Sequence, residues 1–502
     1  MKRHIVTLVI VHLALAAMAQ PVSIRLEAPA HAGQSAVLYR YDDLFTLRLA
    51  RIADAILDEA GQARISAEVS GTARLRLRIG DVHGDLYARP GSDYRIRVEP
   101  PDDRLARTIS GTARIDLLFM GLDALDLNAL TSDLNARIDE FIAEDLATDQ
   151  AAGMQALPVV RKDAAAPDSA RRPPTLFVMP TWSKARVDSF EARVRHFYRE
   201  VQDPWFAHYL DYSFAGLRHG PRVNDDELFK HHLASKPVIY DDPEYVRFVR
   251  SFFAEQLASA DRHHGPALRH ALESANLDSL NAVLMRNDFL KDERLRELVM
   301  IDLLHQQYHG SVVSASIDSR HGALGILGQV AERSTHPEHR RIAANAVWDL
   351  TAMHVGERLP STRLHGVDGQ DVVLDSLLKG PACVAVTAAW CTYCDQEIQG
   401  LQQLQLQLGD TVPVVVILLD DRIDDARRYA ERHGAGLRWL HAEAERRLRD
   451  DWRIVSLPAF YLLNDGVLAR SPAAPPSRGL GALLHQAKAG TSRDGRVKVW
   501  DD

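Results

Sequence analysis

One stretch in the last third of the chain constrains the fold more than any other, because it joins a strand, two close cysteines and a helix. The run 383–387 is apolar and rich in β-branched residues, which indicates a buried strand. After Cys391 and Cys394, apolar residues recur every three to four positions over 398–408, as on one face of a helix. The two cysteines are therefore expected at a turn from strand to helix.

This placement favours redox chemistry at Cys391. A helix N-terminus presents unpaired N–H groups and roughly half a positive charge, which favour a thiolate over a thiol. In a Cys-x-x-Cys at such a position the thiolate is the reactive form at neutral pH. We expect Cys391 to attack disulfides and Cys394, one helical turn further on, to resolve the mixed disulfide.

The same residues carry a family resemblance. Trp390, Cys391, Cys394 and Glu397 in the pattern Trp-Cys-x-x-Cys-x-x-Glu resemble the active site of the thioredoxin-like superfamily, and specifically its secreted bacterial TlpA/ResA-type branch. Further landmarks lie in the order of that branch, namely a lead-in hairpin over 359–380, a core strand over 412–419 and a proline loop over 455–460. The resemblance covers only the last part of the chain and predicts a thioredoxin-like α/β domain over 357–502.

The resemblance also implies roles for individual residues. It places Pro458 in a cis peptide bond against the cysteines, with the backbone of Leu457 hydrogen-bonding an extended substrate and Trp390 beside it. A buried aspartate precedes the first cysteine by six residues in many thioredoxins, but that position here is Ala385. Glu397 is therefore the remaining candidate to handle the proton of Cys394.

The start of the chain has the features of a secretory signal peptide over 1–19. A basic beginning is followed by an apolar run over 5–17 and by the small-x-small site that ends at Ala19. Cleavage there would leave 502 − 19 = 483 residues. An uncleaved anchor is the alternative, although the run is shorter than the roughly 20 residues that a membrane span needs. We expect a soluble protein of the periplasm.

Composition excludes some partners and ligands. Charges of both signs are mixed throughout a chain of net charge −8, which gives no basic footprint for nucleic acid. The chain has only three cysteines, and Cys383, inside the predicted strand, is expected to be a core residue. His336 and His339 could in principle join the other cysteines around zinc, but structural zinc sites usually draw their ligands from tight knuckles. We therefore expect no metal and no other cofactor.

Two further regions precede the redox domain. Over 20–110 apolar residues alternate with polar ones, as at Leu75, Leu77 and Ile79, which predicts an N-terminal antiparallel β-sandwich. Over 111–356 the period becomes helical and predicts a central all-α region, interrupted by a proline-rich loop over 153–181. The fold class is thus a multidomain α+β protein.

These observations favour an exported thiol-disulfide oxidoreductase. Its partners would be client proteins with thiols or disulfides and, by resemblance, a membrane-embedded thiol carrier. A non-catalytic adaptor of the cell envelope, with an inert disulfide on the same scaffold, is the main alternative. A peroxidase on this fold is a further alternative. We would expect its reactive cysteine to have no second cysteine in an adjacent Cys-x-x-Cys, and the sequence does not show that arrangement.

Overall fold

The computed structural model of the chain describes most of the sequence. The described residues are 21–80, 82–99, 113–162, 184–219, 224–308, 317–391, 394–409, 412–420, 422–434, 436–442, 448–454 and 456–494. The predicted signal peptide over 1–19 lies outside these residues. No helix among them is long and apolar enough to cross a membrane.

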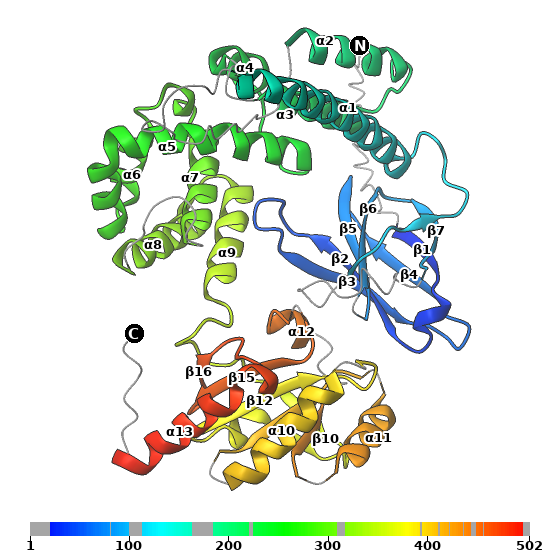
Figure 1. Cartoon of the computed structure of the whole chain (residues 1–502), viewed down its shortest axis with the longest axis vertical. Coiled ribbons are helices and arrows are strands. Elements are labelled where there is room, and N and C mark those ends of the chain that lie inside the picture. Colours follow the sequence, from blue (N-terminus) through cyan, green and yellow to red (C-terminus); the bar gives the residue numbers. More distant parts are fainter. Residues whose placement is uncertain are drawn as a thin grey trace, which may run out of the picture.

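Two sheets form the N-terminal region and share one hydrophobic core (Figure 1). One sheet has the order β4-β1-β7-β9 and the other β3-β2-β5-β6-β8. The strands are β1 (Pro21–Glu27), β2 (Ser35–Tyr41), β3 (Leu49–Ile56), β4 (Gln62–Glu68), β5 (Ala73–Ile79), β6 (Val82–Ala88), β7 (Asp93–Arg97), β8 (Ala113–Arg114) and β9 (Leu118–Phe119). The alternation along β5 buries Leu75, Leu77 and Ile79 in this core.

The sheets differ from the prediction in two respects. They are mixed rather than purely antiparallel, because β1 pairs with β7 and β6 pairs with β8 in parallel. Pairing direction depends on which distant strand returns to an edge, and alternation within a strand carries no information about it. In addition, β8 and β9 lie beyond residue 110, where a helical region was predicted. They are too short to give a periodic signal, so the sequence did not reveal them.

Nine helices follow in the described part of the chain and form a curved row that begins beside the two sheets and ends above the C-terminal domain (Figure 1). They are α1 (Leu127–Lys162), α2 (Lys184–Phe197), α3 (Pro204–Arg218), α4 (Asp225–His232), α5 (Pro243–Glu273), α6 (Leu277–Leu284), α7 (Glu293–Tyr308), α8 (Ile317–Arg333) and α9 (Pro337–Thr351). Asp203 and Asp242 cap α3 and α5 by accepting backbone N–H groups, and a proline follows each cap. The loop predicted over 153–181 is wrong for 153–162, where α1 continues.

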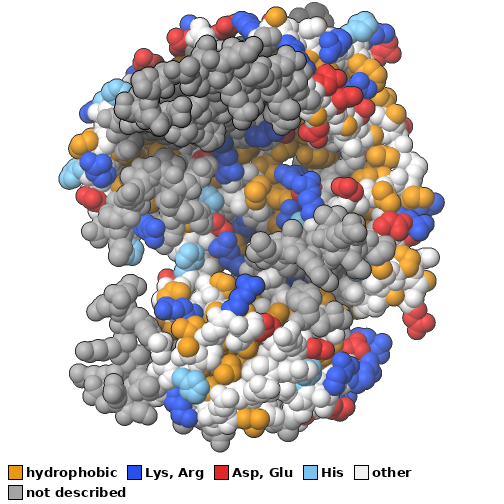
Figure 2. Space-filling view, viewed as in Figure 1, with side chains coloured by type: hydrophobic (Ala, Val, Ile, Leu, Met, Phe, Trp, Pro, Cys, Tyr) orange, Lys and Arg blue, Asp and Glu red, His pale blue; other side chains and the backbone are white. Residues whose placement is uncertain are grey.

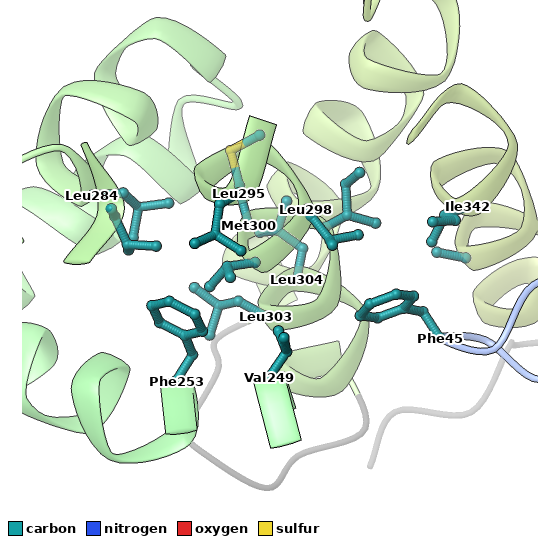
Figure 3. Close-up of a cluster of buried hydrophobic side chains, with 14 of the residues drawn as sticks. Phe45, Val249, Phe253, Leu284, Leu295, Leu298, Met300, Leu303, Leu304 and Ile342 are labelled. Carbon is teal, nitrogen blue, oxygen red and sulfur yellow. The ribbon is translucent and has the colours of Figure 1, made fainter. Parts of the chain in front are cut away.

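The helical core is completed by a loop from the N-terminal sheets. Phe45, between β2 and β3, is 2% exposed and belongs to the same buried cluster as Val249, Leu298 and Ile342. Figure 3 shows its ring pointing into this group of helical side chains. The sheets and the helices are therefore joined by a shared apolar core.

The C-terminal domain is a seven-stranded sheet of order β11-β10-β14-β13-β12-β15-β16. Its strands are β10 (Arg363–Gly366), β11 (Asp371–Val373), β12 (Pro381–Thr387), β13 (Val414–Leu418), β14 (Arg438–His441), β15 (Ala459–Asn464) and β16 (Val467–Arg470), and its helices are α10 (Cys394–Leu408), α11 (Ile423–His433), α12 (Leu448–Asp451) and α13 (Leu480–Asp494). Every residue of β12 is buried, as the apolar run predicts for a strand covered on both faces.

Different elements cover the two faces of this sheet. One face packs against α10, α11 and α13. The other face packs against α12 and the segment that follows α9, and its hydrophobic cluster contains Cys391 and Cys394 together with Met353, Leu448 and Trp452. The cysteines thus lie on the side of the domain that faces the rest of the molecule.

Figure 2 shows the surface of the molecule in the same view as Figure 1. Acidic and basic side chains are mixed over the visible face, and several Lys and Arg side chains lie in the hollow near the middle of the view.

Candidate active site

The sheet register brings the cysteine turn and the proline loop to the same end of the domain. β12 pairs antiparallel with β15, and Val386 lies opposite Ala459. The chain leaves β12 toward Cys391 at the end where it enters β15 from Pro458. Antiparallel neighbours run in opposite directions, so the end of β12 lies beside the start of β15 and the two segments adjoin.

Cys391 and Cys394 form a disulfide at the start of α10. Their sulfur atoms are 2.02 Å apart and their Cα atoms 5.4 Å apart. The N–H of Cys394 donates to the carbonyl of Cys391 (3.1 Å), and α10 begins at Cys394. The pair therefore occupies the strand-to-helix turn that the sequence predicts, with the first cysteine just outside the helix N-terminus.

The disulfide is less accessible than we expect for an attacking sulfur. Cys391 is 2% exposed and Cys394 is fully buried. Leu457 belongs to the same apolar cluster, and Trp390 packs against it. Apolar neighbours therefore pack around the turn, and the first cysteine has little contact with solvent.

The proline loop has the predicted backbone. The peptide bond between Leu457 and Pro458 is cis. Leu457 is buried, whereas Pro458 is partly exposed and lines a cleft of about 740 Å³. The other walls of this cleft come from α10, the residues before and within β15, the loop after β16 and the segment after α9, and they include Met353, Glu397, Trp452, Arg453, Phe460, Ser477 and Arg478. The cleft thus joins the proline loop to the link between the helical region and the domain.

Glu397 faces the loop after β16. Its carboxylate accepts the backbone N–H of Ser477 (3.0 Å) and also the Ser477 hydroxyl. Both residues line the cleft, so these contacts fix part of its wall. The role of Glu397 in handling the proton of Cys394 stays a prediction.

A buried carboxylate behind the cysteine turn was missed in the sequence. Asp420 is 4% exposed, and its two oxygens accept the N–H of Ala389 at 2.9 and 3.0 Å. The Nε2 atom of His441 lies 2.6 Å from the Asp420 carbonyl oxygen. Asp420 follows β13, which is parallel to β12, so both strands deliver residues to one edge. An acidic residue directly after a buried parallel strand is the signal that could have found it.

The third cysteine behaves as a core residue. Cys383 is fully buried in β12, and this burial raises the pKa of its thiol to about 12. A thiol with such a pKa carries almost no thiolate at neutral pH and is not a nucleophile there.

The described residues offer no group of three or more His, Cys, Asp or Glu side chains that could hold a metal ion. Both ring nitrogens of His339, a candidate zinc ligand in the sequence, have protein partners. Nδ1 lies 2.6 Å from the Glu297 carboxylate, and Nε2 lies 2.8 Å from the Tyr240 hydroxyl.

Comparison with known proteins concerns the same part of the chain. Residues 355–471 match the model of the AhpC/TSA family, which confirms the resemblance to thioredoxin-like proteins for this region. No curated protein matches the chain. The narrower TlpA/ResA assignment stays a prediction.

Several solved structures match about a quarter of the chain. A Bacteroides vulgatus protein provisionally named as a thiol-disulfide oxidoreductase is 21% identical over 27% of this chain and 99% of its own, with a TM-score of 0.26. A Chlorobium tepidum protein provisionally named thiol:disulfide interchange protein DsbE is 19% identical over 27% and 99%, with a TM-score of 0.25. A secreted disulfide oxidoreductase of Mycobacterium tuberculosis is 17% identical over 25% and 95%, with a TM-score of 0.22.

Proposed function

We propose that the protein is an exported thiol-disulfide oxidoreductase that exchanges disulfides with client proteins through Cys391 and Cys394. The observation that carries this proposal is the disulfide at the N-terminus of α10, adjoining the cis-proline loop. A helix N-terminus stabilises the thiolate that is released when such a disulfide opens.

The exchange itself takes two steps. A client thiolate attacks the sulfur of Cys391, the bond between the two cysteines breaks, and Cys394 leaves as a thiolate. A second client thiolate then attacks the client sulfur of the mixed disulfide and releases Cys391. The client is oxidised to a disulfide and the Cys391–Cys394 pair is reduced, and the reverse sequence reduces a client. A membrane-embedded thiol carrier would accept the two electrons after a client is oxidised, and would supply two electrons after a client is reduced.

Export to the periplasm is part of the proposal and depends on the signal-like residues 1–19. N-terminal sequencing of the protein recovered from the cell envelope tests it, and a mature chain that begins near Gln20 is the expected result.

Trapping tests the proposed chemistry. The Cys394→Ser variant is expected to accumulate mixed disulfides with clients through Cys391, because the resolving thiol is absent. The variant that also carries Cys391→Ser is the matched control and should trap nothing. Absence of mixed disulfides from the single variant, together with no turnover of any model disulfide by the unmodified protein, would contradict the proposal.

One observation favours the adaptor alternative, namely the 2% exposure of Cys391. An inert structural disulfide has a reduction potential below about −300 mV, whereas catalytic ones are more oxidising. Equilibration of the protein with a dithiol redox buffer therefore separates the two functions.

A further inference from the structure

The segment 448–454, which we call the junction segment, comprises α12 and the three residues after it. Three residues separate its last member, Ile454, from Pro458. Leu448, Trp452 and Ile454 belong to the apolar cluster that contains both redox cysteines. Any displacement of the junction segment therefore acts on the proline loop and on the layer that covers the disulfide.

The N-terminal sheets hold one side of the junction segment. The Asp450 carboxylate accepts the hydroxyl of Tyr39 at 2.9 and 3.0 Å and the guanidinium of Arg78 at 3.1 Å. Arg449 is only 7% exposed and donates to the carbonyl of Gly80 (2.8 Å) and to that of Ile454 (3.3 Å). One guanidinium thus ties the sheets to the backbone just before the proline loop.

The helical region holds the other side. The guanidinium of Arg453 donates to both the carboxylate and the backbone carbonyl of Asp349 in α9. It also lies 5.4 Å from the ring of Trp348, whose ring is contacted at 4.2 Å by Arg48 of the N-terminal region. Trp348 is therefore contacted by cations from both other parts of the molecule.

The backbone of Arg453 ends helix α12. Its φ of 49° lies in the left-handed region, and the N–H of Ile454 donates to the carbonyl of Arg449 (2.8 Å), as at many helix C-termini. Arg453 lines the same cleft as Pro458 and Glu397. The contacts with Asp349 and Trp348 thus hold a residue of the cleft wall.

We propose that the junction segment is a positioning device through which the N-terminal sheets and the helical region shape the cleft that Pro458 lines, and that this cleft binds polypeptide clients and so selects them over small thiols. Arg449, Asp450 and Arg453 are its positioning residues. The inference rests on the proposed function. It follows from the contacts because both kinds of thiol must pass the layer over Cys391, whereas only a polypeptide is long enough to contact the cleft beside Pro458 as well.

Two variants release the two sides separately. Arg453→Asn removes the guanidinium but keeps a residue that tolerates the left-handed region, so the variant adds no backbone strain. Asp450→Asn weakens the contacts with Tyr39 and Arg78. Arg428→Met is the control, because among the described residues this exposed side chain has an ion pair with Asp425 of the same helix and with no other group.

The measurement is the rate at which the oxidised protein reacts with reduced, unfolded ribonuclease A and with dithiothreitol. Each junction variant is expected to lower the ratio of the first rate constant to the second by about 5-fold or more, a usual size for coupling between sites. The control is expected to leave the ratio unchanged. An unchanged ratio in both junction variants would overturn the inference.

Hydrogen exchange keeps the inference separate from the proposed function. Amides over 456–461 are expected to exchange about 5-fold faster or more in both junction variants than in the control. If the protein reacts with no thiol, the proposed function fails, and unchanged exchange would by itself overturn the positioning role.

Discussion

The N-terminal sheets contact the helices through apolar and polar groups, such as the ion pair of Arg89 with Asp203, and two of their contacts with the rest of the molecule can be compared. Toward the helices they insert Phe45, which is 2% exposed, into a core with Val249 and Leu298 (Figure 3). Toward the redox domain they use hydrogen bonds and ion pairs from Tyr39 and Arg78 to Asp450. The first contact excludes water and the second stays partly hydrated.

The difference indicates what each contact is for. Burial of an aromatic ring contributes several kcal/mol, does not depend on salt and suits a permanent joint. Partly exposed polar contacts contribute about 1 kcal/mol each and can be exchanged for water at little cost. The sheets and helices therefore form one stable unit, and the redox domain is held against it by a contact that can adjust.

The largest effect is expected at the apolar contact. Phe45→Ala should lower the free energy of unfolding by about 3–5 kcal/mol, because it removes buried apolar surface and leaves a cavity. Urea unfolding followed by circular dichroism measures this. Leu47→Ala, in the same loop but 48% exposed, should change it by less than about 0.5 kcal/mol. Equal losses in both variants would show that the ring is not the anchor.

An ion cluster of the N-terminal sheets should respond to pH. Its central carboxylate, Asp85, accepts the hydroxyl of Tyr41, which belongs to the same buried cluster as Phe45. Burial would raise the pKa of Asp85, but hydrogen bonds from Arg76 and the charge of Arg74 outweigh it, so the pKa is lowered. A carboxylate with a lowered pKa stabilises the fold at neutral pH and loses that stabilisation as the pH falls below about 4.

Asp85→Asn should therefore lower the free energy of unfolding by about 1–3 kcal/mol at pH 7. Below about pH 4 this free energy should fall less steeply in the variant than in the unmodified protein. Asp93→Asn is the control, because Asp93 pairs with Arg25 on the open surface. An unchanged acid limb in Asp85→Asn would contradict the expectation.

A smaller effect is expected at the junction. Tyr39→Phe removes the hydroxyl that donates to Asp450, and Asp450→Asn removes the charge that accepts it. A double-mutant cycle on unfolding free energies should give a coupling of about 0.5–2 kcal/mol. Coupling near zero would mean that the two residues are close without supporting each other.

Salt gives the smallest effect and the sharpest contrast. Raising NaCl from about 0.1 M to about 1 M shortens the screening length from about 10 Å to about 3 Å. Amides of the junction segment should then exchange faster, whereas those next to Phe45 should not, since apolar burial is not screened. Equal responses would remove the distinction between the two contacts.

Local patterns were enough to predict the redox turn. A buried strand, a Cys-x-x-Cys and an amphipathic helix occur in sequence order, and the structure places Cys391 and Cys394 accordingly. The cis bond before Pro458 was predicted by the family resemblance alone. The pattern did not reveal Asp420, which reaches Ala389 from the next strand, or the limited exposure of Cys391. Both depend on what packs around the turn.

The sequence by itself determined the elements, because strand and helix periods, turn residues and the spacing of two cysteines are properties of neighbouring residues. Only the tertiary structure decided that β1 and β7 run parallel, that Phe45 completes a helical core, and that Arg453 and Asp349 meet. These pairs are separated by many residues, and the free energy that joins them comes from burial and charge in three dimensions, which leave no period in the sequence.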